Sequence, residues 1–170
     1  MVKYLKEADI ETLADDLRKN HGQISAPVDV IELATNEGIA VYKASFDSEH
    51  VCGMLRRENG KTSIYFNRNH PLTRQRYTIA HELGHHILHA DTSEFVDEEL
   101  NLYRLSGDTD ANPSKRRQEI QANLFGASLL MPKSLLVDAF KATSDVAALA
   151  RLFDVSEAAM GFRINALDLG

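Results

Sequence analysis

The sequence has a single cysteine, no long apolar segment and no excess of positive charge. With one cysteine, Cys52, the chain cannot form an internal disulfide, which is typical of proteins of the reducing cytosol. No second cysteine lies at metal-ligand spacing, and we therefore interpret Cys52 as a small apolar filler of the core. No run of apolar residues approaches the length that crosses a bilayer. We therefore expect a cytoplasmic protein that does not bind a membrane.

The charge pattern argues against nucleic acid as the main ligand. The formal net charge is −6, whereas phosphate binding needs clustered lysine and arginine. The only short basic cluster is "SKRR" at residues 114–117, which can equally be the solvated first turn of a helix. We expect no direct contact with nucleic acid.

The beginning of the chain, "MVKYLKEADIETLADDLRK", is charged from the start and lacks the apolar core of a signal peptide.

The size and the periodicity of the chain predict one α+β domain. The chain has 170 residues, of which 44% are hydrophobic and 26% charged, and neither an internal repeat nor a low-complexity tract interrupts it. We expect a single domain over residues 1–170, with a helical part from about residue 132 to residue 170 packed on it. Apolar residues recur at helical spacing over residues 10–19, and "PVDVIELATNEG" predicts a second helix with Pro27 in its first turn and Gly38 at its end.

From residue 39 onward the period of the apolar residues changes to two, which predicts strands. Residues 39–46, 51–57 and 62–67 have this pattern, and Asn59-Gly60 predicts a tight turn between the last two. We expect a small antiparallel sheet of three strands with residues 62–67 at its edge. The edge strand could bind a substrate as an additional strand, or it could be a plain half-buried edge.

Helices predominate in the rest of the chain. A long helix is expected to begin near Pro71 and to run through His89. Residues 91–112 have little pattern and many acidic side chains, although a short helix over residues 94–105 is possible. Pro113 suits the first turn of a strong helix that ends before Pro132, and Ser156 is a candidate N-cap of the last one. Further helices are expected over residues 132–141, 145–154 and 155–167.

The stretch "AHELGHHILH" predicts a metal site on the long helix. His81 and His85 lie four residues apart, so both imidazoles lie on one helix face and can bind the same ion. Glu82 is rotated by about 100° from His81, which places its carboxylate beside the ion, where it can deprotonate water. This His-Glu-x-x-His pattern is typical of catalytic zinc. Gly84 costs about 1 kcal/mol inside a helix, which indicates that another segment passes close by.

A catalytic zinc needs a third protein ligand. His89 lies two turns, about 12 Å, from His81, too far for both to bind one ion, so we interpret it as a support behind the ligands, a cation at the helix end or a packed side chain. Glu119 is the best candidate because it lies in the strongest downstream helix, and Asn123, one turn later, could accept a hydrogen bond from His81 or His85. The acidic segment offers rival ligands, namely Glu94, Asp97, Glu98 and Glu99.

Two blocks, "RQRYTIAHELGHHILH" and "EIQANLFGASLLMP", together strongly resemble the ImmA/IrrE family of small zinc metallopeptidases, which are cytoplasmic anti-repressors. The resemblance covers residues 39–132 well, and the second block, Glu-x-x-Ala-Asn-x-Phe-x-x-x-Leu-Leu-Met-Pro, is the more specific of the two. Gly126 stands where the family often has alanine, a small-for-small change. The resemblance implies a minimal zincin-like fold and a gluzincin-like site, in which one Zn²⁺ is bound by His81, His85 and Glu119 with Glu82 as the base.

The resemblance also implies a substrate class and leaves several alternatives open. The expected partner is an XRE-type helix-turn-helix repressor of a prophage, a mobile element, a stress regulon or a toxin–antitoxin module, and the expected reaction is hydrolysis of a peptide bond. Oxyanion donors could be Tyr103, Tyr77 or His89. The ligand types also suit manganese or iron. A protein that grips its partner without turnover and a DNA reader built from residues 145–164 are the rival functions, but the second helix of that unit offers only Arg163 as a basic residue.

Overall fold

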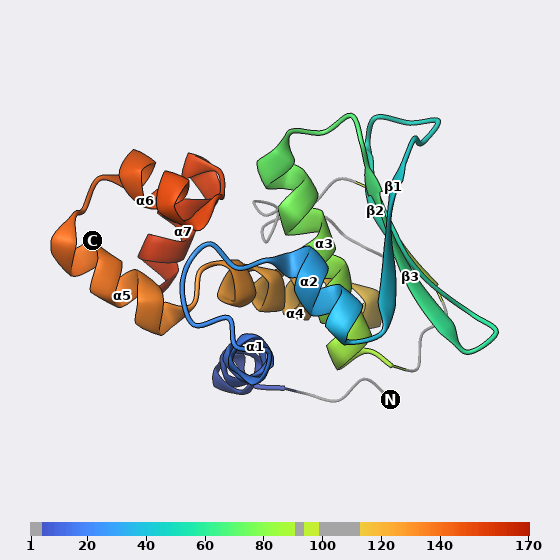
Figure 1. Cartoon of the computed structure of the whole chain (residues 1–170), viewed down its shortest axis with the longest axis horizontal. Helices are drawn as coiled ribbons and strands as arrows, with labels where there is room; N and C mark the ends of the chain where they lie inside the picture. Colours follow the sequence, from blue (N-terminus) through green and yellow to red (C-terminus); the bar gives the residue numbers. More distant parts are fainter. Residues whose placement is uncertain (1–4, 91–93, 99–112) are drawn as a thin grey trace.

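The computed structural model describes residues 5–90, 94–98 and 113–170 (Figure 1). Helices form most of it, and a small sheet lies along one side, which confirms the α+β class. The elements in chain order are α1 (Glu7–Asn20), α2 (Val30–Asn36), β1 (Ile39–Ala44), β2 (Val51–Glu58), β3 (Lys61–Asn67), α3 (Leu72–Leu88), β4 (Glu94–Glu98), α4 (Pro113–Leu130), α5 (Lys133–Ala142), α6 (Val146–Phe153) and α7 (Glu157–Ala166). Within the described residues, none of the helices is both long and apolar enough to span a membrane.

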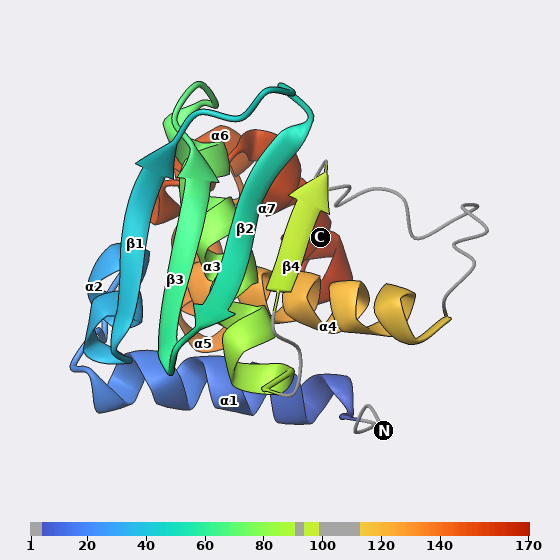
Figure 2. The same ribbon diagram turned by 90° about the vertical axis from the view of Figure 1, so that its right-hand side faces the viewer.

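The sheet differs from the expected one in strand number, direction and order. It has four strands in the order β1-β3-β2-β4, as Figure 2 shows from the front. β3 pairs with β1 in parallel and with β2 antiparallel, and β4 pairs antiparallel with the other side of β2. The prediction of three antiparallel strands was therefore wrong, because alternating hydrophobicity identifies strands but not their neighbours. β3 is central, so the prediction that residues 62–67 form an edge was wrong as well.

A fourth strand occupies residues 94–98, the first part of the segment in which a short helix seemed possible, and residues 99–105 lie outside the described residues. Glu94–Glu98 is extended and pairs with β2. A strand of five residues gains its stability from hydrogen bonds to a partner far away in the sequence, which no local pattern reveals. The pairing contains an irregularity between Val51 and Gly53, where the register of β2 shifts.

Turns and helix ends follow the local sequence more closely. Asn59 and Gly60 have φ angles of 51° and 73°, so the two residues that predicted the β2–β3 turn do adopt the left-handed conformation that such turns require. Ser156 caps α7 by accepting a hydrogen bond from the amide of Ala159. The second helix begins later than expected, because the carboxylate of Asp29 caps it by accepting from two amides and leaves Pro27 outside.

The helix α3 lies against the sheet, and α4 crosses α3 on the side away from the sheet (Figures 1 and 2). Along one stretch of α3 nine consecutive residues are buried, because the sheet covers one face and α4 another. These are Tyr77, Thr78, Ile79, Ala80, His81, Glu82, Leu83, Gly84 and His85. Cys52 of β2 is fully buried, as expected for a core filler. The predicted metal motif is therefore held between two layers of the fold.

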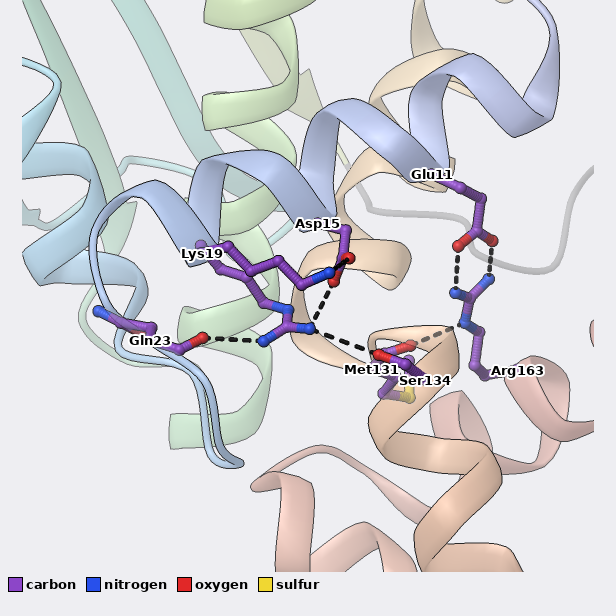
Figure 3. Close-up of polar contacts among 8 residues, drawn as sticks. Glu11, Asp15, Lys19, Gln23, Met131, Ser134 and Arg163 are labelled. Atoms are coloured by element: carbon purple, nitrogen blue, oxygen red, sulfur yellow. Dashed lines mark hydrogen bonds and ion pairs between the residues drawn. The ribbon is translucent and has the colours of Figure 1, made fainter.

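The helices α5–α7 lie beyond α4, away from the sheet (Figure 1), and arginine side chains connect them to the rest. Arg163 of α7 donates two hydrogen bonds of 2.6 and 2.8 Å to the carboxylate of Glu11, and its Nε donates to the carbonyl of Met131 at 3.0 Å (Figure 3). Arg76 of α3 contacts the carboxylate of Asp154 at 3.1 Å. The bidentate Arg163–Glu11 pair fixes orientation as well as contributing energy.

Candidate metal centre

Two glycines allow α3 and α4 to approach closely where the candidate ligands lie. A Cβ atom on Gly84 would lie 3.1 Å from the carbonyl oxygen of Ala122, and one on Gly126 would lie 3.2 Å from the amide nitrogen of His81. Both distances are shorter than an ordinary van der Waals contact. This confirms that another segment passes close to Gly84, and that segment is α4. The glycine in place of alanine at position 126 faces the backbone at His81.

The close crossing brings His81, His85 and Glu119 together. The Nε2 atoms of the two histidines are 3.0 Å apart, and they lie 3.2 and 3.4 Å from the two carboxylate oxygens of Glu119. Both imidazoles are buried, whereas the side chain of Glu119 is 30% exposed. The site is thus enclosed on the side of α3 and accessible on the side of Glu119.

These donors fit a zinc ion in number, type and spacing. One ligand atom from each of the three residues lies within 4.8 Å of the others. Donors that surround zinc tetrahedrally at about 2 Å lie about 3.3 Å from one another. The two imidazole nitrogens lie 3.0 Å apart, close to that figure, and each lies at a similar distance, 3.2 or 3.4 Å, from a different oxygen of the Glu119 carboxylate. Two imidazoles and one carboxylate also leave the fourth tetrahedral position for water, as catalytic zinc sites require.

The charge state of the group also suits a cation. Burial lowers the pKa of His85 from 6.5 to about 4, so its imidazole is neutral near pH 7. Burial alone would raise the pKa of Glu119, but hydrogen bonds with His81 and His85 outweigh it and bring the pKa below its ordinary value. Glu119 is therefore a carboxylate. A neutral imidazole and a carboxylate are the protonation states that bind metal.

We predict that the metal-free protein loses stability between about pH 6.5 and pH 4. In that range His85 binds a proton when the chain is unfolded but not when it is folded, so acid favours unfolding. A shift of this size corresponds to about 3 kcal/mol in the free energy of unfolding. Urea denaturation of the metal-free protein across this range measures the loss, and the difference from a His85→Gln variant isolates the contribution of this imidazole. Identical pH profiles of the two proteins would contradict the prediction.

Glu82 lies on the face of α3 that packs against β2. It is fully buried, and its Oε1 lies 3.5 Å from the position that a Cβ atom on Gly53 would occupy. The same Cβ would lie 2.3 Å from the methyl group of Thr78 and 2.8 Å from the carbonyl oxygen of Tyr65. Because Gly53 has no side chain, α3 can pack directly onto the strand and keep Glu82 in place.

Replacing Gly53 by alanine should therefore destabilise the protein by about 1–3 kcal/mol, the usual cost of overpacking a core. The added methyl group cannot fit beside Thr78 and the backbone at Tyr65 without moving α3. Chemical denaturation of the two proteins measures the difference. Gly161→Ala is the matched control: nothing lies within 4 Å of a Cβ there, and alanine in a helix should stabilise by up to about 1 kcal/mol. A Gly53→Ala protein as stable as the native one would contradict the steric argument.

Asn123 contacts one of the two candidate histidine ligands. Its Oδ1 lies 2.9 Å from Nδ1 of His81, and no hydrogen bond to His85 is found among the described contacts. The hydroxyl of Tyr77 donates to the main-chain oxygen of Asn123 at 3.1 Å. Of the proposed oxyanion donors, Tyr77 is thus engaged with α4, and Tyr103 lies outside the described residues.

The other two histidines of the motif are not among the three grouped donors and contact other groups. His89 is buried, with its Nε2 3.2 Å from the carbonyl oxygen of Gln118, and burial lowers its pKa. Its ring centroid lies 5.5 Å from that of His85. His86 faces β2, where its Nδ1 lies 3.5 Å from Nη2 of Arg57. The rival ligands Glu94, Asp97, Glu98 and Glu99 lie outside the residues whose side chains the structure describes.

Two residues of β2 that support the site were not predicted. Arg57 donates to the carbonyl oxygens of His86 and His89, each at 3.3 Å, and so holds the C-terminal end of α3. Gly53 holds the middle of the same helix against the sheet. The isolated glycine within a strand pattern was a usable signal for close approach, whereas nothing local distinguishes Arg57 from a surface arginine.

Comparison with known proteins agrees with this geometry. No curated protein matches the chain. A solved structure described as a Mycobacterium tuberculosis transcriptional regulator has the same fold, with a TM-score of 0.67 and 19% sequence identity. The similarity covers 92% of this chain but 46% of that one, so the chain spans about half of its length. The model of the peptidase family Peptidase_M78, described as the IrrE N-terminal-like domain, matches residues 34–165, and the chain therefore belongs to this family.

Proposed function

We propose that this protein is a zinc-dependent endopeptidase that cleaves, and thereby inactivates, a helix-turn-helix repressor or antitoxin in the cytoplasm. The observation that carries the proposal is the donor set of His81, His85 and Glu119 at tetrahedral spacing, with Glu82 next to the first ligand. Membership of a peptidase family supports the reaction class. The sequence resemblance to cytoplasmic anti-repressors supports the substrate class.

The chain would supply ligands, orientation and a base. His81, His85 and Glu119 would hold the zinc ion, and Asn123 would keep the proton of His81 on Nδ1 so that Nε2 can bind metal. Zinc supplies Lewis acidity, lowering the pKa of water and polarising a carbonyl oxygen.

Glu82 would transfer the proton. It takes a proton from the attacking water, whose oxygen forms a bond to the carbonyl carbon of the substrate. When the carbon–nitrogen bond then breaks, Glu82 gives that proton to the leaving amine. The burial of Glu82 between α3 and β2 restricts its motion, which favours repeated transfer along one path.

A partner-gripping protein without turnover is the second candidate. The presence of Glu82 argues against this binding function, because neither metal binding nor partner binding needs a base at this position. The DNA-reading alternative is weakened further by Arg163, which is 4% exposed and paired with Glu11 rather than presented on the surface of α7. A recognition helix needs its basic side chains in the groove.

The substrate class can be tested by mapping new protein termini. Zinc-loaded protein and a Glu82→Gln variant are each incubated with a native cytoplasmic extract that contains helix-turn-helix regulators, and new N-termini are identified by mass spectrometry. The proposal predicts termini that depend on Glu82 and fall within such regulators. Glu82-dependent termini confined to unrelated proteins would reject the substrate class, and none at all would reject the peptidase function.

A further inference from the structure

We propose that His89 is a positioning residue for the third candidate ligand: its imidazole holds the peptide group that joins Gln118 to Glu119 and so keeps the Glu119 carboxylate beside the two histidines of α3. The inference rests on the proposed function, because it concerns the same metal site. The sequence suggested a support behind the ligands of α3 among other roles, whereas the ring contacts α4, the helix that carries Glu119.

The ring of His89 connects the end of α3 to the second turn of α4. His89 is the residue that follows α3, and it is 5% exposed. Its Nε2 lies 3.2 Å from the carbonyl oxygen of Gln118. A carbonyl oxygen can only accept a hydrogen bond, so the imidazole donates. That oxygen belongs to the peptide group whose nitrogen is the amide of Glu119, and the contact therefore holds the backbone directly before the ligand.

Glu119 lies before the part of α4 that packs most tightly on α3. The tight backbone contacts with α3 are made by Ala122 and Gly126, both of which follow Glu119. Residues 113–117, which precede it, are exposed, and the first turns of α4 extend past β4 in Figure 2. The contact with His89 therefore holds α4 on the N-terminal side of the ligand.

The backbone of His89 is itself held by the sheet. The guanidinium of Arg57 on β2 donates to the carbonyl oxygens of His86 and His89, each at 3.3 Å. Carbonyl groups at the end of a helix have no partner within the helix, so these bonds keep the last turn of α3 in place. His89 is thus fixed at its backbone while its ring holds α4, which sets the position of Glu119 relative to the helix that carries the two histidine ligands.

A second contact of the ring defines the rival role. The ring centroid of His89 lies 5.5 Å from that of His85, so His89 could support this imidazole by packing alone. The two roles differ in their dependence on Glu119. Loss of packing would act on His85 whether or not Glu119 binds metal, whereas loss of the hydrogen bond to Gln118 would act only through Glu119.

The test is a double-mutant cycle on zinc affinity, measured by competition with a chromophoric chelator in the absence of any substrate. His89→Leu keeps a side chain of similar size but removes the donor. It should weaken zinc binding by about tenfold, the low end of the range for groups that support metal ligands. In a protein that already carries Glu119→Ala, the same substitution should change the affinity by less than about twofold, because no third ligand is left to position.

Two other results would overturn the proposal. Unchanged zinc affinity in His89→Leu would show that the imidazole has no part in metal binding. An equal loss with glutamate and with alanine at position 119 would show that the ring supports only the histidines. His21→Leu is the control for the substitution itself, because His21 pairs with Glu37 at 2.8 Å and is not among the three grouped donors. It should leave zinc affinity unchanged.

Hydrogen exchange in the metal-free protein checks the contact directly. The amides of residues 119–122 should exchange at least about threefold faster in His89→Leu than in the native protein, because the turn that contains them is no longer held. His89→Gln, which keeps an N–H donor, should remain close to the native rates. Unchanged exchange in His89→Leu would contradict the proposal even if zinc affinity fell. Neither experiment uses hydrolysis as its readout, so the inference can hold or fail independently of the peptidase function.

Discussion

Replacing Glu82 by glutamine is expected to slow peptide-bond hydrolysis by about a thousandfold, within the usual range for loss of a general acid–base. Glutamine has nearly the same shape but cannot take a proton from water. Because Glu82 is not among the three grouped donors, zinc affinity should stay within about twofold of the native value. Steady-state cleavage of an identified substrate, with zinc content measured on the same preparation, gives both quantities.

The control for this prediction is Glu58→Gln, which removes a carboxylate from the far end of β2, where the side chain is 59% exposed. It should leave the cleavage rate unchanged. If the Glu82→Gln protein cleaved its substrate at the native rate, Glu82 would not be the base. If it retained zinc, cleaved nothing and still inactivated the repressor, the partner-gripping function would be the correct one.

Replacing Glu119 by alanine is expected to weaken zinc binding by at least about a hundredfold. The substitution removes one of three protein ligands and the only negative charge among them. Even residues that only hydrogen-bond to a metal ligand typically change metal affinity or activity by about 10- to 100-fold when they are mutated. Hydrolysis should be lost at zinc concentrations that saturate the native protein. Competition with a chelator measures the affinity, and elemental analysis measures the bound metal.

The matched control is Glu157→Gln in the first turn of α7, which is exposed and remote from the three donors. Retention of native zinc affinity in Glu119→Ala would mean that the third ligand comes from elsewhere. Glu94, Asp97, Glu98 and Glu99 would then be the next residues to substitute.

Features of the fold that depend on neighbours in the sequence could be predicted. The Asn59-Gly60 turn and the Ser156 cap each depend on a few adjacent residues, and both were predicted. The order of the strands depends on pairing between distant segments. β3 lies between β1 and β2, so both of its edges are paired. Its alternating sequence does not reveal this, because alternation identifies a strand but not its neighbours.

The same distinction applies to the candidate site. The geometry of His81 and His85 follows from the pitch of one helix, so their spacing was enough to pair them. Glu119 comes from another helix, and it was chosen because it lies in the strongest downstream helix with Asn123 one turn later, a choice that the resemblance of the second sequence block then supported. The structure adds why the two helices can meet: Gly84 and Gly126 remove the side chains that would separate them. The contributions of Gly53 and Arg57 from β2 depend on how the sheet packs against α3: the isolated glycine in a strand was a signal that we did not use, whereas the role of Arg57 became visible only in three dimensions.

Cleavage in ¹⁸O-labelled water tests the central claim most directly, with one purified helix-turn-helix repressor as the substrate. Zinc-loaded protein should produce two fragments, the new carboxylate of one carrying a single ¹⁸O atom from the solvent, while protein treated with a chelator should produce none. Inactivation of the repressor by zinc-loaded protein without any new terminus would contradict the account and establish binding alone as the activity.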